Sequence, residues 1–283
     1  MYKTNQDIEQ IIYDVYDSLE KNNFKTLGRS DEKMWEKPLI GIAAGDDPYF
    51  DFLKEHIGEF HWNPEEAFRL KYSENVSVQK LKVVSMVFPQ TDVTKQKQLK
   101  ETKCPSREWI VTRGEWEPLM EEFSVKLVKK LEDMGVRSVS IDLQPEFSTV
   151  RSEKQGIASR WSHRHVAHLA GLGTFGLSDG LITEKGKAIR ITSLIIEAPL
   201  TPTERSYTSH NEWCLYYKNG SCQACIKRCP FNAISLEGHD KDICADYEEL
   251  FAKKYLPLDI DKRDYILGCG LCQVGIPCQD KKP

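Results

Sequence analysis

Several features are scarce in this sequence of 283 residues, and each absence removes a class of protein. No run approaches the ~18 consecutive apolar residues that a membrane-spanning helix needs. Residues 1–10 are polar and lean acidic, without the basic stretch and apolar run of a secretory signal. The net charge is only −4, so composition gives no reason to expect a nucleic acid or an anionic membrane as partner. We therefore expect a cytoplasmic protein.

Cysteine is almost missing from the larger part of the chain. Of the nine cysteines, only Cys104 precedes residue 214. The others are Cys214, Cys222, Cys225, Cys229, Cys244, Cys269, Cys272 and Cys278. An extracellular disulfide scaffold would be short and rich in cysteine throughout, and this chain shows no export signal. We therefore interpret the C-terminal cysteines as ligands of a metal or cluster, and Cys104 as a bystander in a loop.

The rest of the chain has an ordinary globular composition, with 40% hydrophobic and 29% charged residues. Helical spacing of apolar residues predicts helices over residues 4–27, 49–56, 115–134 and 152–169. Apolar runs predict strands over residues 38–44, 80–88, 138–143 and 189–197. The stretch 91–103 is expected to be a loop or a loosely packed helix, with the lysine-rich residues 95–103 as solvated surface. We predict a body at 1–205 and a second domain at 206–283.

One motif decides between the kinds of metal site. Cys222, Cys225 and Cys229 form C-x2-C-x3-C, and Pro230 follows at once. Bacterial ferredoxins carry C-x2-C-x2-C-x3-C-P, in which the last cysteine ligates the other cluster. The first position of that run is Asn219 here, which cannot serve as a thiolate ligand. Cys214 lies just upstream and is a candidate substitute.

The spacings fit two [4Fe-4S] clusters with crossed donation, because each cubane needs four thiolates and the tail supplies two sets. The predicted first set is Cys214, Cys222, Cys225 and Cys278. The predicted second set is Cys229, Cys244, Cys269 and Cys272. If Cys214 does not ligate, the first cluster has three protein thiolates and is a three-iron form or takes a foreign ligand. Two such clusters pass single electrons.

Zinc is the main alternative, because two C-x2-C pairs can build a ribbon or treble-clef site. A structural zinc takes four ligands, however, and half of the cysteines would then have no role. Zinc also gives no reason for Pro230 after Cys229 or for the residues 231–234 that follow. Iron–sulfur ligation is therefore the preferred interpretation over zinc and over disulfides.

The quoted cysteines stand in segments that resemble a known group. Residues 219–230 (NGSCQACIKRCP), 242–247 (DICADY) and 268–273 (GCGLCQ) resemble the ferredoxin module of epoxyqueuosine reductases and reductive dehalogenases. Residues 168–176 (HLAGLGTFG), 180–183 (GLIT), Gly186 and 190–193 (RITS) are similar to the cobalamin-domain segment of the same group. The resemblance is specific from about residue 163 to Cys278 and only architectural before that.

The resemblance implies an α+β chain: an α/β nitroreductase-like (cobalamin-reductase-like) body with a C-terminal bacterial-type 2[4Fe-4S] ferredoxin module. It implies that the body binds cobalamin and that the clusters reduce the cobalt. Gly171, Gly173 and Gly176 would let the backbone approach the corrin, and Ser193 would also contact the cofactor.

The segment before these glycines departs from the family pattern. Epoxyqueuosine reductases carry an acidic proton donor there, whereas residues 156–163 (GIASRWSH) contain no carboxylate. We therefore expect a substrate other than epoxyqueuosine. The C-x5-C spacing from Cys272 to Cys278 is also longer than the gap of the family.

Two weaker patterns lie beside the glycine segment. Residues 171–176 match G-x-G-x-x-G, but a dinucleotide fold needs a strand before this motif and a helix after it, and a helix is predicted before it here. His163, His165 and His168 cluster with two arginines, and imidazoles titrate near neutrality. His163 and His165 are therefore candidate catalytic proton donors, with a polar helix face as the alternative.

These observations predict an iron–sulfur reductase. The tail would take single electrons from a donor such as ferredoxin or flavodoxin and pass them to a cofactor, first of all cobalamin, that reduces a small-molecule substrate. One alternative is an electron-transfer protein that reduces the corrinoid of a partner protein. Another is a ferredoxin module on a body that binds flavin or nothing.

Overall fold

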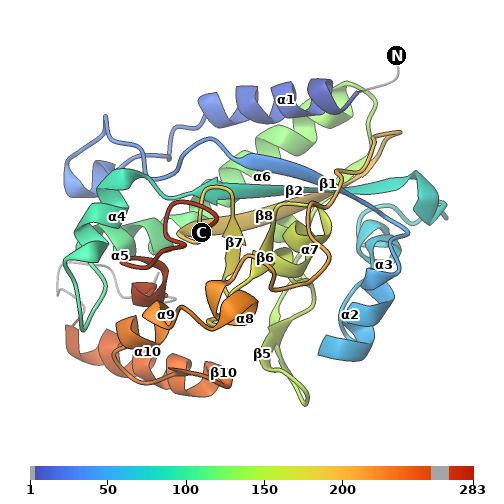
Figure 1. The fold of residues 1–283 in the computed structure, drawn as a ribbon. Coiled ribbons are helices and arrows are strands. Elements are labelled where there is room, and N and C mark those ends of the chain that lie inside the picture. The colour runs from blue at the N-terminus through green and yellow to red at the C-terminus, as the bar shows by residue number, and fades with distance from the viewer. Residues whose placement is uncertain (1–3, 256–267) are drawn as a thin grey trace.

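The computed structural model describes residues 4–255 and 268–283. Its main sheet, in this described part, runs in the order β1-β2-β8-β3, and every neighbouring pair is antiparallel (Figure 1). The strands are β1 (Leu39–Ala44), β2 (Leu81–Pro89), β8 (Ile189–Glu197) and β3 (Ser138–Ser140). Because no strand pair is parallel, the mixed fold is of the α+β kind rather than doubly wound.

Helices cover both faces of this sheet (Figure 1). The helices α1 (Asn5–Asp17) and α6 (Trp116–Asp133) pack on one face, against Val84, Met86 and Phe88 of β2. The helices α2 (Tyr49–Ile57), α3 (Pro64–Arg69) and α7 (His163–Leu169) pack on the other, against Leu81 and Val83. Side chains alternate between the faces along a strand, so β2, which is buried throughout, supplies both cores.

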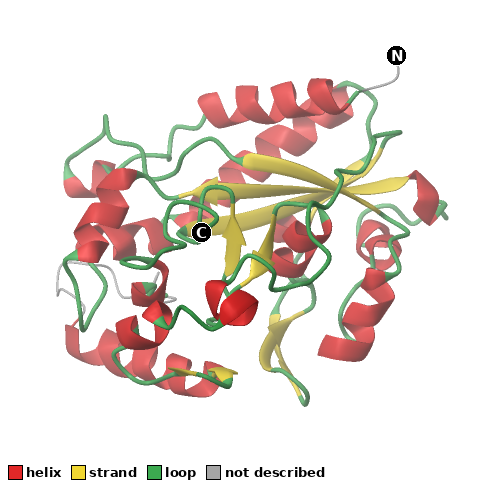
Figure 2. Ribbon diagram, in the orientation of Figure 1, coloured by secondary structure: helices red, strands yellow, loops and turns green. Residues whose placement is uncertain are grey.

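Shorter elements surround this frame, and Figure 2 separates them by type. The remaining helices are α4 (Asp92–Leu99), α5 (Arg107–Gly114), α8 (Leu215–Asn219), α9 (Ala224–Arg228) and α10 (Lys241–Tyr255). The hairpins are β4–β5 (Thr149–Ser152, Gly156–Ser159), β6–β7 (Gly173–Phe175, Leu181–Thr183) and β9–β10 (Ile234–Ser235, Gly238–His239). The 3-10 turns are Lys25–Leu27, Val78–Lys80, Ile141–Leu143 and Leu271–Gln273.

The predicted strands over 38–44, 80–88 and 189–197 and the helices over 49–56 and 115–134 are confirmed. The helix predicted over 152–169 is wrong in its first half, which forms the β4–β5 hairpin. Gly156 has φ +62°, a left-handed conformation that ends any helix and closes the hairpin turn. The helix predicted over 4–27 ends at Asp17, and the strand predicted over 138–143 ends at Ser140.

The stretch 91–103 contains the helix α4, and its lysines at 97, 100 and 103 are exposed as predicted, whereas Lys95 is buried. Lys95 on α4 is 6% exposed. Its Nζ lies 2.9 Å from Asp92 and 2.6 Å from Asp280, a residue of the C-terminal tail. The sequence prediction was wrong at Lys95 because a distant segment covers it and supplies a carboxylate.

The residues after 206 share a core with the body. Tyr207, Trp213 and Ile234 pack with Leu177 and Ile182 around the β6–β7 hairpin. The tail also reaches α4 and α5, where Gln98 and Trp109 donate side-chain hydrogen bonds to the carbonyls of residues 269 and 268, both at 2.8 Å. The predicted boundary at 205 falls in an exposed loop. None of the described helices is long and apolar enough to cross a bilayer.

The core on the α6 face generates a stability prediction. Phe88 is fully buried, and its ring centroid lies 5.3 Å from that of Phe123 and 5.6 Å from that of Trp116. We expect Phe88→Ala to lower the free energy of unfolding by about 3–5 kcal/mol, because it leaves a cavity that these rings cannot fill. Val125→Ala, at a position 51% exposed on α6, should change it by less than about 0.5 kcal/mol. Urea unfolding that gives equal losses would contradict this packing.

Candidate functional site

All nine cysteines are free thiols in the structure. The four of the predicted first set come from three places in the chain. Cys214 caps the start of α8, Cys222 and Cys225 lie at the start of α9, and Cys278 lies in the tail. All four line one cavity, which we call the cysteine cavity. Asn219 does not line it, so Cys214 stands where the interrupted motif lacks a ligand.

The cysteines of the predicted second set lie within electrostatic reach of one another. Cys229 follows α9, and Cys244 lies on α10. Cys269 precedes the last 3-10 turn, Leu271–Gln273, and Cys272 lies within it. Burial raises the pKa of Cys244 to about 12, and the neighbouring Glu248, Cys272 and Cys229 add to the increase. Burial likewise raises the pKa of Cys269, with contributions from Cys272 and Cys244.

Burial also acts on two thiols of the first set in the metal-free chain. Burial raises the pKa of Cys225, and it raises that of Cys278 to about 11. A bound cation reverses this preference, because a coordinating thiol is deprotonated. Among residues 4–255 and 268–283, no three His, Cys, Asp or Glu side chains converge tightly enough to hold a single metal ion.

A second and larger cavity, of about 450 Å³, opens beside the cysteine cavity. We call it the cleft. Its wall is built from α2, the β4–β5 hairpin, the start of α7, the β6–β7 turn and the C-terminal part of the chain. The side chains that line the cleft include those of Tyr49, Phe52, Ser162, Arg164, His165, Phe175, Asp179, Tyr217 and Lys241.

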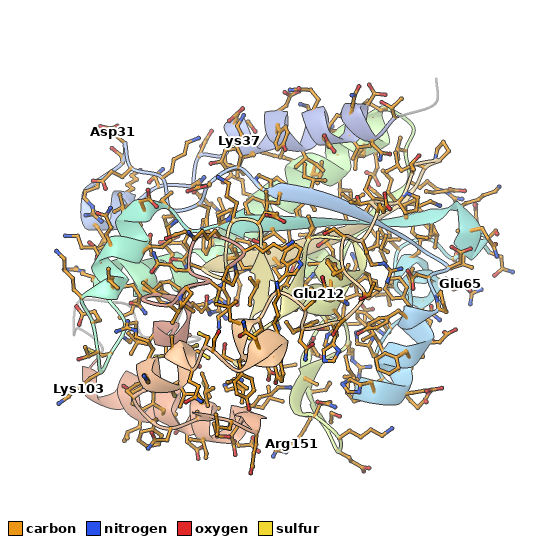
Figure 3. All side chains as sticks on the ribbon, in the orientation of Figure 1. Asp31, Lys37, Glu65, Lys103, Arg151 and Glu212 are labelled. Carbon is orange, nitrogen blue, oxygen red and sulfur yellow. The ribbon has the colours of Figure 1, made fainter. Side chains whose placement is uncertain are left out.

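The hairpin wall of the cleft is tied to α10. Arg151, labelled in Figure 3, donates to both carboxylate oxygens of Asp242, at 3.0 and 2.8 Å. Lys241, which precedes Asp242 in the chain, donates through Nζ to the carbonyls of Gln155 and Ile157, at 3.0 and 3.2 Å. Hydrogen bonds from one helix end therefore hold the hairpin strands in place along this side of the cleft.

Of the two predicted catalytic histidines, only His165 lines the cleft. Its Nδ1 lies 2.7 Å from Ser162 Oγ, and its ring centroid lies 4.8 Å from that of Phe175. Burial, with the nearby Arg164 charge, holds the pKa of His165 well below its usual range. The imidazole is therefore neutral at physiological pH, and one ring nitrogen is engaged by serine.

His163 belongs to a buried polar network outside the cleft lining. Its Nδ1 lies 2.9 Å from Ser193 Oγ, and its Nε2 lies 3.3 Å from an Asp142 carboxylate oxygen. Burial raises the pKa of Asp142, but His163 and a hydrogen bond from Thr192 outweigh it and lower the pKa overall. The structure thus gives His163 and Ser193 internal partners.

The predicted cofactor-binding glycines are placed differently from one another. Gly176 lines both the cleft and the cysteine cavity, whereas Gly171 and Gly173 line neither. A Cβ on Gly173 would lie 2.1 Å from the carbonyl oxygen of Ile182, so glycine is required there by the hairpin itself. Ser193 is fully buried and accepts a hydrogen bond from Trp161 Nε1 at 2.9 Å.

The G-x-G-x-x-G match has the wrong context for a dinucleotide site. Helix α7 precedes it, and its middle residues form strand β6. A strand before the motif and a helix after it are needed for the pyrophosphate to meet a helix N-terminus. The interpretation as a turn beside the cleft is therefore retained.

Several cleft residues were not predicted. Asp179 has φ +56° in the turn between β6 and β7. Burial raises the Asp179 pKa, but the His239 side chain at 3.3 Å and the Arg164 charge lower it overall. Tyr49, Tyr217 and Lys241 come from helices far apart in the chain, and no local pattern marks them.

The chain was compared with known proteins. No family model matches it. The epoxyqueuosine reductase of Leadbetterella byssophila is 32% identical over 110 residues, which are 38% of this chain and 33% of that protein. The structure of epoxyqueuosine reductase from Bacillus subtilis aligns with a TM-score of 0.50 and 16% identity, over 97% of this chain and 67% of that one. An epoxyqueuosine reductase solved with a modified tRNA stem loop aligns with a TM-score of 0.49 and 16% identity, over 96% and 66%.

This chain resembles the epoxyqueuosine reductases. The predicted resemblance is confirmed, and the mixed fold matches that of the Bacillus subtilis epoxyqueuosine reductase. The sequence match spans about a third of the curated epoxyqueuosine reductase, 33% of its length, so the activity of that enzyme is not carried over here. The absence of a nucleic-acid partner stays a prediction.

The support beneath His165 gives a prediction on pH. His61 is fully buried, and its Nε2 accepts a hydrogen bond from the Ser162 backbone at 3.1 Å. Burial lowers the His61 pKa to about 4. The unfolded chain protonates this histidine near pH ~6.5, so its stabilisation is complete above that pH and is lost as pH falls toward 4.

We expect the free energy of unfolding of the wild type to fall, between pH 7 and pH 4, by about 3 kcal/mol more than that of His61→Gln. Urea unfolding at both pH values measures the difference. The exposed His210→Gln is the control and should follow the wild type. Parallel pH curves for the wild type and His61→Gln would show that His61 titrates normally in the folded state.

Proposed function

We propose that this chain is an iron–sulfur reductase whose C-terminal cysteines hold two [4Fe-4S] clusters. The observation that carries the proposal is the cysteine cavity, which brings Cys214, Cys222, Cys225 and Cys278 together from separate parts of the fold. Soft thiolate ligands select iron–sulfur clusters, zinc or copper(I) among biological metals. Two complete sets of four thiolates match two cubanes, whereas zinc leaves one set unexplained.

The second cluster would be held by Cys229, Cys244, Cys269 and Cys272. Their mutual electrostatic effects support this grouping. The Cys229 sulfur accepts a hydrogen bond from the backbone N–H of Ala233 at 3.3 Å. Hydrogen bonds of this kind to cluster sulfurs are one of the ways in which proteins set cluster potentials.

The arrangement favours one order in which the two clusters pass electrons. Gly176 lines both cavities. Burial raises the pKa of Tyr217, a residue of the cleft, and the nearby Cys214 and Cys225 add to the increase. No cysteine of either set lines the cleft itself, so the contact with the cleft runs through Gly176 and Tyr217. A bound cluster takes and gives one electron at a time. The second set therefore serves as the entry, toward a donor such as ferredoxin or flavodoxin, and the first set as the exit to the cleft.

His165 is the proposed proton donor of the cleft. In the tautomer in which Ser162 Oγ donates to Nδ1, the ring N–H lies on Nε2. This N–H can hydrogen-bond a bound molecule, and the imidazole would deliver a proton to a reduced substrate as the imidazolium, after taking that proton from solvent. His163, predicted beside it, would act only by packing beneath the cleft.

Cobalamin is the proposed cofactor, and the cleft was tested against it. The cleft walls carry the rings of Tyr49, Phe52 and Phe175, which suit a flat ligand. A volume of about 450 Å³ suits a drug-sized ligand or one part of a cobalamin, and Phe52 and Tyr217, 43% and 46% exposed, leave the mouth open for the rest. Cobalamin would supply low-potential cobalt there, and Gly176 is the one predicted glycine placed to face it.

The substrate is proposed to be a small molecule other than epoxyqueuosine. The hairpin and the start of α7, which form one wall of the cleft, contribute no carboxylate to it. Asp179 is the single carboxylate among the cleft residues of the described chain, and its partner is His239. Two rival functions use the same clusters with a different electron acceptor. In one, the acceptor is the corrinoid of a partner protein, and in the other it is a flavin bound in the body.

Iron counting tests the cysteine assignment. We expect about eight irons per chain after anaerobic reconstitution of the wild type. Cys214→Ala should lose iron, or retain a three-iron form with its own paramagnetic spectrum, because Cys214 completes the first set. Cys104→Ala is the matched control and should keep the full count, since Cys104 lies outside both sets. Full loading of Cys214→Ala would remove Cys214 from the ligands, and a zinc-only wild type would overturn the proposal.

A spectral titration tests the cofactor. We expect cobalamin added anaerobically to the reconstituted protein to change its visible bands and to stay bound through gel filtration. Ala158→Trp, which fills the cleft from β5, should abolish retention, whereas the exposed Val125→Trp on α6 should not. Yellow fluorescence released from the purified protein would favour flavin instead. Reduction of an added corrinoid protein without retained cobalamin would favour the electron-transfer alternative.

A further inference from the structure

Lys187 is a buried cation with no ion-pair partner among the Asp and Glu residues of the described chain. The residue is 2% exposed. Its Nζ donates a hydrogen bond to Ser178 Oγ. No Asp or Glu of the described residues lies within ion-pair distance of it, whereas the buried Lys95 has two such partners. An isolated buried ammonium costs several kcal/mol, so a compensating negative charge is expected near Lys187.

The position of Lys187 is set on several sides. Its backbone N–H donates to the carbonyl of Cys278 at 2.9 Å and to that of Gln279 at 3.2 Å. Its aliphatic stem fills the space beside Gly180, where an added Cβ would lie 2.8 Å from Lys187 Cδ. The Lys187 side chain lines the cysteine cavity together with all four cysteines of the first set. The ammonium therefore faces the place where four thiolates gather.

In the first set, burial raises the pKa of Cys225 and Cys278, and Lys187 opposes both increases.

We propose that Lys187 is a positioning residue of the first cluster site, whose charge raises the reduction potential of the cluster held there. This inference rests on the proposed function. Each reduction adds one electron, and hence one negative charge, to a cage that already carries net negative charge with its thiolates. A fixed cation nearby stabilises the reduced form more than the oxidised form, and so raises the potential.

The test is a potentiometric titration of the full chain, reconstituted anaerobically and followed by its paramagnetic spectrum, with dithionite as the electron source. Lys187→Met keeps the stem and removes the charge. We expect the first cluster to become harder to reduce by at least tenfold in the one-electron equilibrium constant, which is about 59 mV. Lys187→Arg, which keeps the charge, should restore the wild-type potentials. Lys185→Met removes an exposed lysine two residues away and should leave them unchanged.

Each outcome has a stated meaning. Equal iron and unchanged potentials in Lys187→Met would overturn the inference. Loss of iron from Lys187→Met with full iron and wild-type potentials in Lys187→Arg supports it, because charge alone separates the two variants. Loss of iron from both would show that Lys187 acts only by packing, and so overturn it. A wild type that binds no iron would instead refute the proposed function, which the iron count reports before any potential is measured.

Discussion

The site depends on the attachment of the C-terminal tail to the end of the β7–β8 connection. Gly186 has φ +78°, and a Cβ there would lie 2.1 Å from the carbonyl oxygen of Gln279. This absence of a side chain lets the tail approach closely enough for Lys187 to donate its two backbone hydrogen bonds. Cys278 is thereby carried from the end of the chain to the cysteines of α8 and α9. Without this docking, the first set would have three members.

The second set depends on a comparable attachment, made by one arginine. The Arg228 guanidinium donates to the carbonyls of Leu271 and Val274, at 3.2 and 2.9 Å, and to that of Glu101 at 2.9 Å. It lies next to Cys229 in the chain, while Leu271 lies next to Cys272. A planar group with several donors can bind several carbonyls at once, which a lysine cannot do in the same geometry. The tail, α9 and the α4–α5 loop are therefore joined at the point where second-set cysteines meet.

Part of this could be predicted from the sequence where the signal is local. Three strands of the main sheet follow from apolar runs. Spacing alone grouped Cys214, Cys222, Cys225 and Cys278, which line one cavity in the fold, while their role as ligands stays a prediction. The cleft could not be predicted, because its wall joins α2, a hairpin, the β6–β7 turn and α10. The hairpin itself was mistaken for helix, since the positive φ of Gly156 is a property of the folded turn. Lys187 belongs to no sequence motif, and only the folded chain shows that no described Asp or Glu lies within ion-pair distance of it.

The two histidines show why residue type and position are not enough to assign a role. His163 and His165 are two residues apart on α7, a spacing that turns their side chains to different sides of a helix. One side meets the central sheet, where His163 Nδ1 lies 2.9 Å from Ser193 Oγ and its buried Nε2 lies 3.3 Å from an Asp142 carboxylate oxygen. The other side meets the cleft, where His165 Nδ1 lies 2.7 Å from Ser162 Oγ. A proton donor has to reach the bound molecule. Access to the cleft, rather than closeness to the glycine segment, is therefore what favours His165 as the proposed donor.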